Sequence, residues 1–129
     1  MKFRSYITVL LFLSFVACET EAALTYNITN NASFPVTVIR TRADGQLFTD
    51  TFKIAPNSQI TIAENGEGLD VVSTYKEVLD TLRRFPMINI YKNDTQKAKT
   101  DFRKTSRWTY NEKSKHQADY LLTVTESDF

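Results

Sequence analysis

Four runs of alternating apolar and polar residues fill the stretch LTYNITNNASFPVTVIRTRADGQLFTDTFKIAPNSQITIA, residues 24–63, and this stretch decides the fold class. Apolar side chains at every second position are typical of strands that bury one face. Turn-forming residues separate the runs at Asn30–Ser33, at Asp44-Gly45 and at Pro56-Asn57. Four strands joined by short turns predict an antiparallel meander or part of a β-sandwich.

The strand pattern returns after residue 86. It covers Met87–Lys92 (MINIYK), Ser106–Asn111 and Tyr120–Thr125, while Thr95–Thr105 between them is polar and is expected to be a loop or a ragged hairpin. Seven short strands in about 100 residues match the size of an immunoglobulin-like sandwich, although the cysteines of that family are missing. We therefore expect a mainly β protein with a single antiparallel β-sandwich domain over residues 24–129.

A change of spacing between residues 74 and 85 predicts one amphipathic α-helix. Apolar residues recur there every three or four positions, which places them on one helix face. Thr74 and Glu77 match a capping box, and Pro86 would end the helix. The residues on the apolar face are Tyr75, Val78, Leu79, Leu82 and Phe85.

The first 18 residues, MKFRSYITVLLFLSFVAC, have the pattern of an export signal. Lys2 and Arg4 supply the positive start, and an almost wholly apolar run covers residues 6–17. A helix that crosses a bilayer needs about 20 apolar residues, so this run is too short to be a lasting anchor. We expect a signal peptide over residues 1–17.

The residues before Cys18 resemble the lipobox of bacterial lipoproteins, in which a cysteine follows a small residue at the end of the apolar run. This resemblance implies that Cys18 is lipidated and becomes the new N-terminus, with residues 18–23 as a tether. Phe15 departs from the usual leucine. The alternative is ordinary cleavage after Cys18 or Ala22, which would release an unanchored protein. Because Cys18 is the only cysteine, a lipidated chain would contain no disulfide.

Three further stretches carry a wider resemblance. After a leader that ends in Cys18, the chain opens with YNITNNASFPVTV, continues with MINIYKND and closes with ADYLLTVTESDF. Together they resemble short uncharacterised lipoproteins of Bacteroidetes. The resemblance implies a small β domain, attached through a lipid on Cys18 to the cell envelope at the outer membrane. It implies no catalytic or binding residues.

The sequence offers little for catalysis. Cys18 belongs to the leader or to the lipid site, and the single histidine, His116, lies in a hydrophilic stretch without a triad or a metal-site pattern. Glu64, Glu67 and Asp70 share a loop that lacks the ligand spacing of an EF-hand. We therefore expect neither an enzyme nor a cofactor or metal site.

Basic and aromatic residues gather in the segment 92–107 and at the tryptophan that follows it. Such a surface binds anionic lipid headgroups or acidic glycans, although a solvated charged loop is the alternative interpretation. Without Lys2 and Arg4, 14 basic residues face 15 acidic ones, so nucleic acid is not an expected partner. The candidate ligand surface consists of Lys97, Lys99, Arg103, Lys104, Arg107 and Trp108.

Several short motifs match glycosylation acceptors. Asn27, Asn31 and Asn93 each begin an Asn-x-Ser/Thr triplet, and Asp80-Thr81-Leu82 resembles the O-glycosylation acceptor of Bacteroidetes. The expected function is that of a non-enzymatic binding or structural module of the cell envelope, with a glycan or an envelope protein as partner. The alternatives are a secreted, unanchored glycoprotein or effector, and a domain that binds a membrane surface or acidic glycan through residues 92–108.

Overall fold

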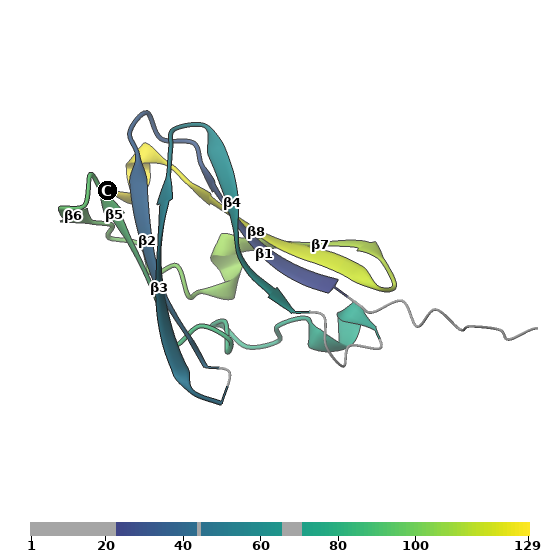
Figure 1. The fold of residues 1–129 in the computed structure, drawn as a ribbon. Coiled ribbons are helices and arrows are strands. Elements are labelled where there is room, and N and C mark those ends of the chain that lie inside the picture. Colours follow the sequence, from purple (N-terminus) through teal and green to yellow (C-terminus); the bar gives the residue numbers. More distant parts are fainter. Residues whose placement is uncertain (1–22, 44, 66–70) are drawn as a thin grey trace, which may run out of the picture.

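The computed structural model describes residues 23–43, 45–65 and 71–129, which form two β-sheets (Figure 1). The predicted leader, Cys18 and residues 18–22 of the predicted tether lie outside the described residues. One sheet has the strand order β4-β1-β8-β7, and the other has the order β3-β2-β5-β6. The strands are β1 (Ala23–Asn30), β2 (Val36–Ala43), β3 (Leu47–Ile54), β4 (Ser58–Asn65), β5 (Met87–Lys92), β6 (Gln96–Lys97), β7 (Trp108–Ser114) and β8 (Gln117–Val124).

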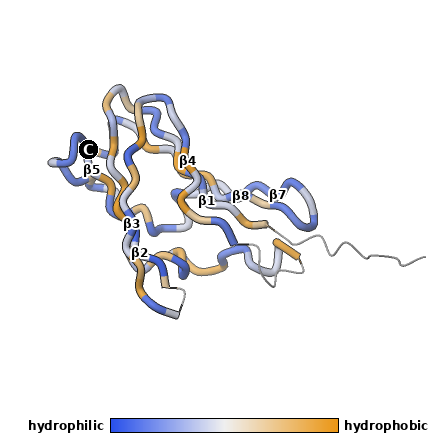
Figure 2. Tube along the Cα trace, viewed as in Figure 1, coloured by the Kyte–Doolittle hydropathy of each residue, from blue (hydrophilic) through white to orange (hydrophobic). Residues whose placement is uncertain are grey.

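The mainly β, sandwich-like fold agrees with the sequence pattern, and the seven expected strands are all present. An eighth strand, the two-residue β6, lies in the part that was expected to be a loop or ragged hairpin. Hydrophilic and hydrophobic residues alternate along the strands, as Figure 2 shows. In β8 this alternation buries every second side chain from Ala118 to Val124.

The prediction of a wholly antiparallel sandwich is wrong for one sheet. β1 pairs with β8 in parallel, from Ala23 opposite Gln117 to Asn30 opposite Val124. On its other side β1 pairs antiparallel with β4, so this sheet is mixed. Hairpins between consecutive strands are antiparallel and can be recognised locally, whereas a parallel pair joins strands that are distant in the sequence. Strand periodicity does not show such a partner.

The predicted helix over residues 74–85 is also wrong. The described residues contain no α-helix, only the 3-10 turns η1 (Val72–Tyr75), η2 (Thr105–Arg107) and η3 (Glu126–Asp128). No helix in this part of the chain is long and apolar enough to cross a membrane.

Beyond the η1 turn, backbone groups of the 71–86 connection bond to other segments of the fold. The amide of Leu82 donates to the carbonyl of Arg103 at 2.8 Å, and the carbonyl of Asp80 accepts from the amide of Thr105 at 2.8 Å. The isolated helix would be only about three turns long, a length at which helices are marginal in water. Tertiary hydrogen bonds therefore decide the conformation of this connection.

The 71–86 connection lies where the two sheets separate. In Figure 1 the sheets are close together at the upper end and diverge toward the lower part of the view, where the connection from β4 to β5 runs. Its side chains Val72, Leu82 and Phe85 are fully buried and belong to the same apolar core as the strands. The Phe85 ring packs edge-on against Tyr26 of β1, with 5.0 Å between the ring centroids. The connection thus completes the core at the open end of the sandwich.

The opposite end of the sandwich is closed around Asn30, the last residue of β1. The side chain of Asn30 is fully buried, and its Nδ2 donates to the carbonyls of Phe34 at 2.8 Å, of Ile54 at 3.1 Å and of Ala55 at 3.3 Å. Its side-chain oxygen accepts from the amide of Ala32 at 3.0 Å. A single side chain therefore connects the β1–β2 turn to the β3–β4 turn, which joins the two sheets.

Candidate functional site

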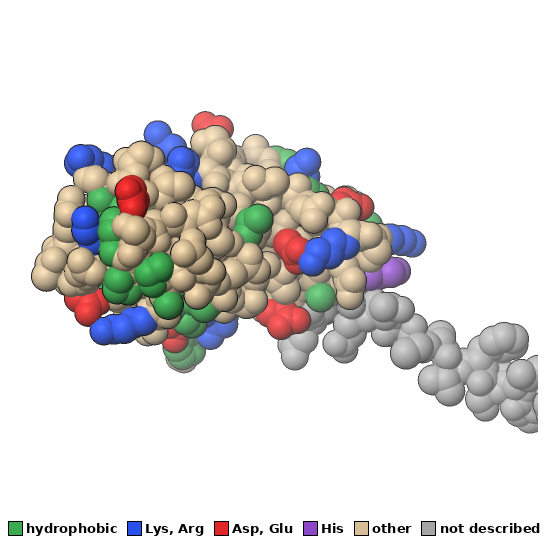
Figure 3. All heavy atoms as spheres, turned by 90° about the horizontal axis from the view of Figure 1, so that it is seen from above, with side chains coloured by type: hydrophobic (Ala, Val, Ile, Leu, Met, Phe, Trp, Pro, Cys, Tyr) green, Lys and Arg blue, Asp and Glu red, His purple; other side chains and the backbone are tan. Residues whose placement is uncertain are grey.

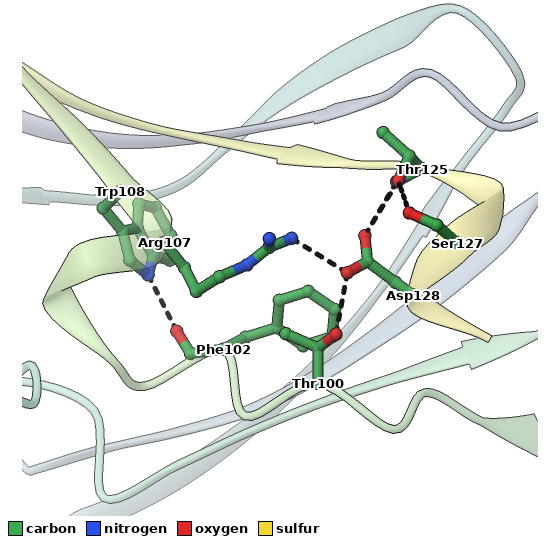
Figure 4. Close-up of polar contacts among 7 residues, drawn as sticks. All are labelled: Thr100, Phe102, Arg107, Trp108, Thr125, Ser127 and Asp128. Carbon is green, nitrogen blue, oxygen red and sulfur yellow. Dashed lines mark hydrogen bonds and ion pairs between the residues drawn. The ribbon is translucent and has the colours of Figure 1, made fainter.

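The structure buries the aromatic member of the predicted ligand surface. Trp108 is only 6% exposed, and its indole N–H donates to the carbonyl of Phe102 at 2.7 Å (Figure 4). Its ring meets Tyr26 edge-on, with 6.0 Å between the centroids. Trp108 therefore contributes to the core and presents no open face to a ligand.

Arg107 also points toward a partner within the fold. Its Nη2 lies 2.8 Å from Oδ1 of Asp128, whose side chain is 4% exposed (Figure 4). Asp128 further accepts from the hydroxyl of Thr100 at 2.7 Å and from the amide of Thr125 at 2.9 Å. This cluster attaches the C-terminal turn η3 to the segment between β6 and β7.

The four remaining basic residues of the predicted ligand surface lie in three places. Arg103 donates from Nε to the carbonyl of Phe85 at 3.0 Å. Lys104 is exposed, and its backbone forms an isolated antiparallel β-bridge with Thr81. Lys97 and Lys99 are exposed and together border an open hollow of about 380 Å³. Of the six predicted residues, the structure therefore brings only these two lysines to one hollow. Its other lining residues are Ile88, Asn89, Ala98, Thr100 and Asp101.

Of the acidic loop at residues 64–70, the structure describes only Glu64 and Asn65. Glu64 lies near the end of β4, whereas Glu67 and Asp70 lie outside the described residues. Within the described ranges, no group of three or more His, Cys, Asp and Glu side chains could hold a metal ion. His116 is half-buried in the β7–β8 turn, where its carbonyl accepts from the amide of Ala23 at 2.7 Å.

A second hollow, of about 330 Å³, lies at the open end and was not predicted from the sequence. The Glu77 side chain in this hollow is only 6% exposed. The Glu77 carboxylate accepts from Nε of Arg83 at 3.2 Å, and the Glu77 amide donates to the Tyr120 hydroxyl at 2.6 Å. The hollow is lined by Leu24, Tyr26, Ala43, Asn65, Thr74, Tyr75, Glu77, Arg83 and Arg84.

Three tyrosines between the hollow and β7 have raised pKa values. Burial, and then the nearby Glu77 carboxylate, raise the pKa of Tyr26 well above its ordinary value. Burial also raises the pKa of Tyr120, and burial together with Glu112 raises that of Tyr110 to about 12. The Tyr120 hydroxyl accepts from the Glu77 amide, and the Tyr110 hydroxyl donates to the Glu112 carboxylate at 3.3 Å. The Tyr26 and Tyr120 rings are stacked 5.1 Å apart, which fixes their positions.

Arg40 is a buried cation on the core face of β2. It is 5% exposed, and its Nη2 lies 2.9 Å from Oδ2 of Asp50. Its guanidinium lies 5.1 Å from the Phe52 ring centroid and 5.8 Å from that of Phe85. Burial lowers the pKa of Arg40, and Asp50 opposes that shift. The residue alternation in β2 already indicates that Arg40 is buried, because Arg40 lies on the same strand face as the buried Val38.

Two of the three Asn-x-Ser/Thr triplets lie in accessible turns. Asn31 and Asn93 are exposed, and Asn93 adopts a positive φ of 47°. Asn27 is 9% exposed, and its side-chain oxygen accepts from the Thr61 hydroxyl at 2.7 Å. In the Asp80-Thr81-Leu82 triplet, Leu82 is fully buried.

Comparisons of the chain with protein-family models, with curated proteins and with solved structures found no significant match.

Proposed function

We propose that this chain is an exported lipoprotein of the cell envelope, and that its β-sandwich domain is a non-enzymatic binding or structural module. The observation that carries the proposal is the leader, with its positive start, short apolar run and Cys18 at the end. The outer membrane is the proposed location.

The hollow bordered by Lys97 and Lys99 is the proposed contact for an acidic glycan or an envelope protein. Both lysines are exposed, and the polar side chains of Asn89 and Thr100 line the same hollow. The hollow also contains the Asp101 carboxylate, so its lining carries two positive charges against one negative charge. Hydrogen-bonding groups beside this excess of positive charge suit a ligand that carries carboxylates or sulfates. Arg107 lies outside this hollow and bonds to Asp128, which also accepts from the hydroxyl of Thr100.

Metabolic labelling with radioactive palmitate tests the lipid anchor. In a bacterial host that processes lipoproteins, the wild-type chain is expected to incorporate label and to fractionate with membranes. Cys18→Ser is the control and is expected to carry no label, because the thioether needs the cysteine sulfur. Unlabelled wild-type protein in such a host would refute the proposal.

The second candidate function is a secreted, unanchored glycoprotein or effector. The exposure of Asn31 and Asn93 in turns favours it, since sugar attachment requires an accessible asparagine. Intact-mass and N-terminal mass spectrometry of the mature protein distinguish the two candidates. A lipid-modified N-terminal Cys18 supports the anchored form, whereas an unmodified N-terminus after Cys18 or Ala22, with sugars on Asn31 or Asn93, supports the secreted one.

A further inference from the structure

Large apolar side chains are exposed on only two segments of the described chain. On the β2–β3 hairpin, Leu47 is 72% exposed and Phe48 is 45% exposed. On the 71–86 connection, Tyr75, Val78 and Leu79 are 39%, 83% and 51% exposed. We call these five residues the apolar edge. Singly exposed apolar residues are common, but a restriction to two segments calls for an explanation.

The two segments lie on the same side of the molecule. The amide of Ala43, opposite Leu47 in the hairpin register, donates to the carbonyl of Arg84 in the connection at 3.4 Å. Ala43 and Tyr75 also line the same hollow at the open end. Figure 1 accordingly shows the hairpin tip and the connection along the lower side of the view.

The chain enters the domain next to this edge. Two consecutive carbonyls of the β7–β8 turn accept hydrogen bonds from backbone amides, one at the start of β1 and one at the start of η1. Lys115 accepts from the amide of Val72 at 3.1 Å, and His116 accepts from the amide of Ala23 at 2.7 Å. The beginning of β1 and the beginning of the connection therefore lie side by side.

Basic side chains lie near the point of entry, where the acidic residues Glu64 and Asp119 also line a hollow together with Ala23. Lys76 follows η1, with its Nζ 5.0 Å from the Tyr110 ring centroid, and Lys115 is exposed in the β7–β8 turn. Arg83 and Lys113 are also exposed but pair with Glu77 and Asp119. Figure 3 shows both basic and acidic side chains, together with the histidine, at this end of the molecule. Lysines in such positions attract an anionic bilayer surface.

We propose that the apolar edge docks onto the surface of the lipid bilayer. The orientation rests on the proposed function, because it assumes a lipid on Cys18. Five residues, 18–22, span at most about 17 Å when fully extended. A lipid on Cys18 therefore keeps Ala23 close to the headgroups, and the apolar edge beside it faces the membrane. Val78 and Leu79 enter the interface, while Lys76 and Lys115 contact anionic headgroups.

Vesicle binding by a chain that cannot be lipidated tests this surface. The mature chain 18–129 with Cys18→Ser is floated with vesicles of phosphatidylcholine and phosphatidylglycerol. We expect it to bind, and we expect Val78→Asp with Leu79→Asp to lower the partition coefficient by about tenfold or more, because two apolar side chains become charged. Asn31→Asp with Ala55→Asp is the matched control, which adds the same two charges at the closed end and is expected to reduce binding far less.

The outcomes separate docking from the anchor and from self-association. No vesicle binding by the Cys18→Ser chain, or equal binding by the Val78→Asp/Leu79→Asp variant, overturns the docking proposal and leaves the palmitate test of the anchor unaffected. A dimer in sedimentation that this variant dissociates also overturns it, because a second copy would then cover the apolar edge. Equal thermal midpoints of the variants, within about 2 °C, show that the fold is intact.

Discussion

The two ends of the sandwich are held together by different kinds of interaction. At the closed end, the buried amide of Asn30 connects two turns through four hydrogen bonds. At the open end, the sheets diverge and apolar side chains of an irregular connection, Phe85 above all, fill the space. The structure of the closed end therefore depends on the hydrogen bonds of a buried side chain, and that of the open end on apolar packing. The comparison shows that a segment without regular structure can complete a core when its backbone bonds to neighbouring segments.

The largest effect is expected from emptying the open end with Phe85→Ala. The side chain is fully buried against Tyr26 and Arg40, so its removal leaves a cavity that the diverging sheets cannot close. We expect a loss of about 3–5 kcal/mol in the free energy of unfolding, measured by urea denaturation. Phe48→Ala, at a ring that is 45% exposed, is the control and should cost much less. Equal costs for the two variants would contradict the role of Phe85.

At the closed end, Asn30→Ala is expected to cost about 2–4 kcal/mol, because several buried backbone groups lose their partner at once. The same denaturation measurement gives the value. Asn31→Ala is the neighbouring control, since Asn31 is exposed, and should stay within about 0.5 kcal/mol of wild type. A loss below about 1 kcal/mol for Asn30→Ala would show that the turns do not need this connection.

The variant Arg107→Ala tests whether Arg107, a member of the predicted ligand surface, contributes to stability instead of ligand binding. Arg107 is partly exposed and Asp128 keeps its bonds from Thr100 and Thr125, so the expected loss is about 1 kcal/mol. Lys97→Ala, at an exposed lysine, should leave stability unchanged. If the hollow beside Lys97 binds acidic glycan, only Lys97→Ala and Lys99→Ala should weaken retention on a heparin column.

A pH-dependent effect is expected from Thr37→Val near the closed end. The Thr37 hydroxyl donates to Asp94, and this bond, followed by that from Lys53, holds the pKa of Asp94 below the ordinary value of 3.8. A depressed carboxyl pKa contributes stability above the unfolded value, and this stability is lost as the pH falls through the folded pKa. Thr37→Val should therefore raise the pKa of Asp94 in an NMR titration and lower stability at neutral pH more than in acid. An unchanged Asp94 titration would contradict this coupling.

The smallest effect on stability is expected from Leu79→Ser on the apolar edge. Leu79 is 51% exposed, so the folded state loses little when it becomes polar, and the change should stay within about 0.5 kcal/mol. Leu82→Ser, three residues further along and fully buried, is the contrasting variant and should be strongly destabilising. Similar losses for both would mean that the connection buries a different face.

Local patterns predicted the strands well because each strand buries one face and each hairpin turn has its own residues. Met87–Lys92 was expected within its observed bounds, and Asn57 and Asn93 adopt the positive φ that their turns require. The 74–85 segment failed because helical spacing also describes a chain that buries Leu82 and Phe85 while it exposes Val78 and Leu79. The predicted ligand surface differs from the observed one for the same reason. A pattern of basic and aromatic residues does not distinguish exposed Lys97 from buried Trp108.

The sequence by itself determined the fold class, most strand positions and the turns, because these depend on alternation and backbone preference over a few neighbouring residues. Only the tertiary structure decided the parallel pairing of β1 with β8, the irregular path of residues 71–86 and the burial of Trp108. Each of these depends on contacts between residues distant in the chain, which supply hydrogen bonds and buried area that local propensity does not encode.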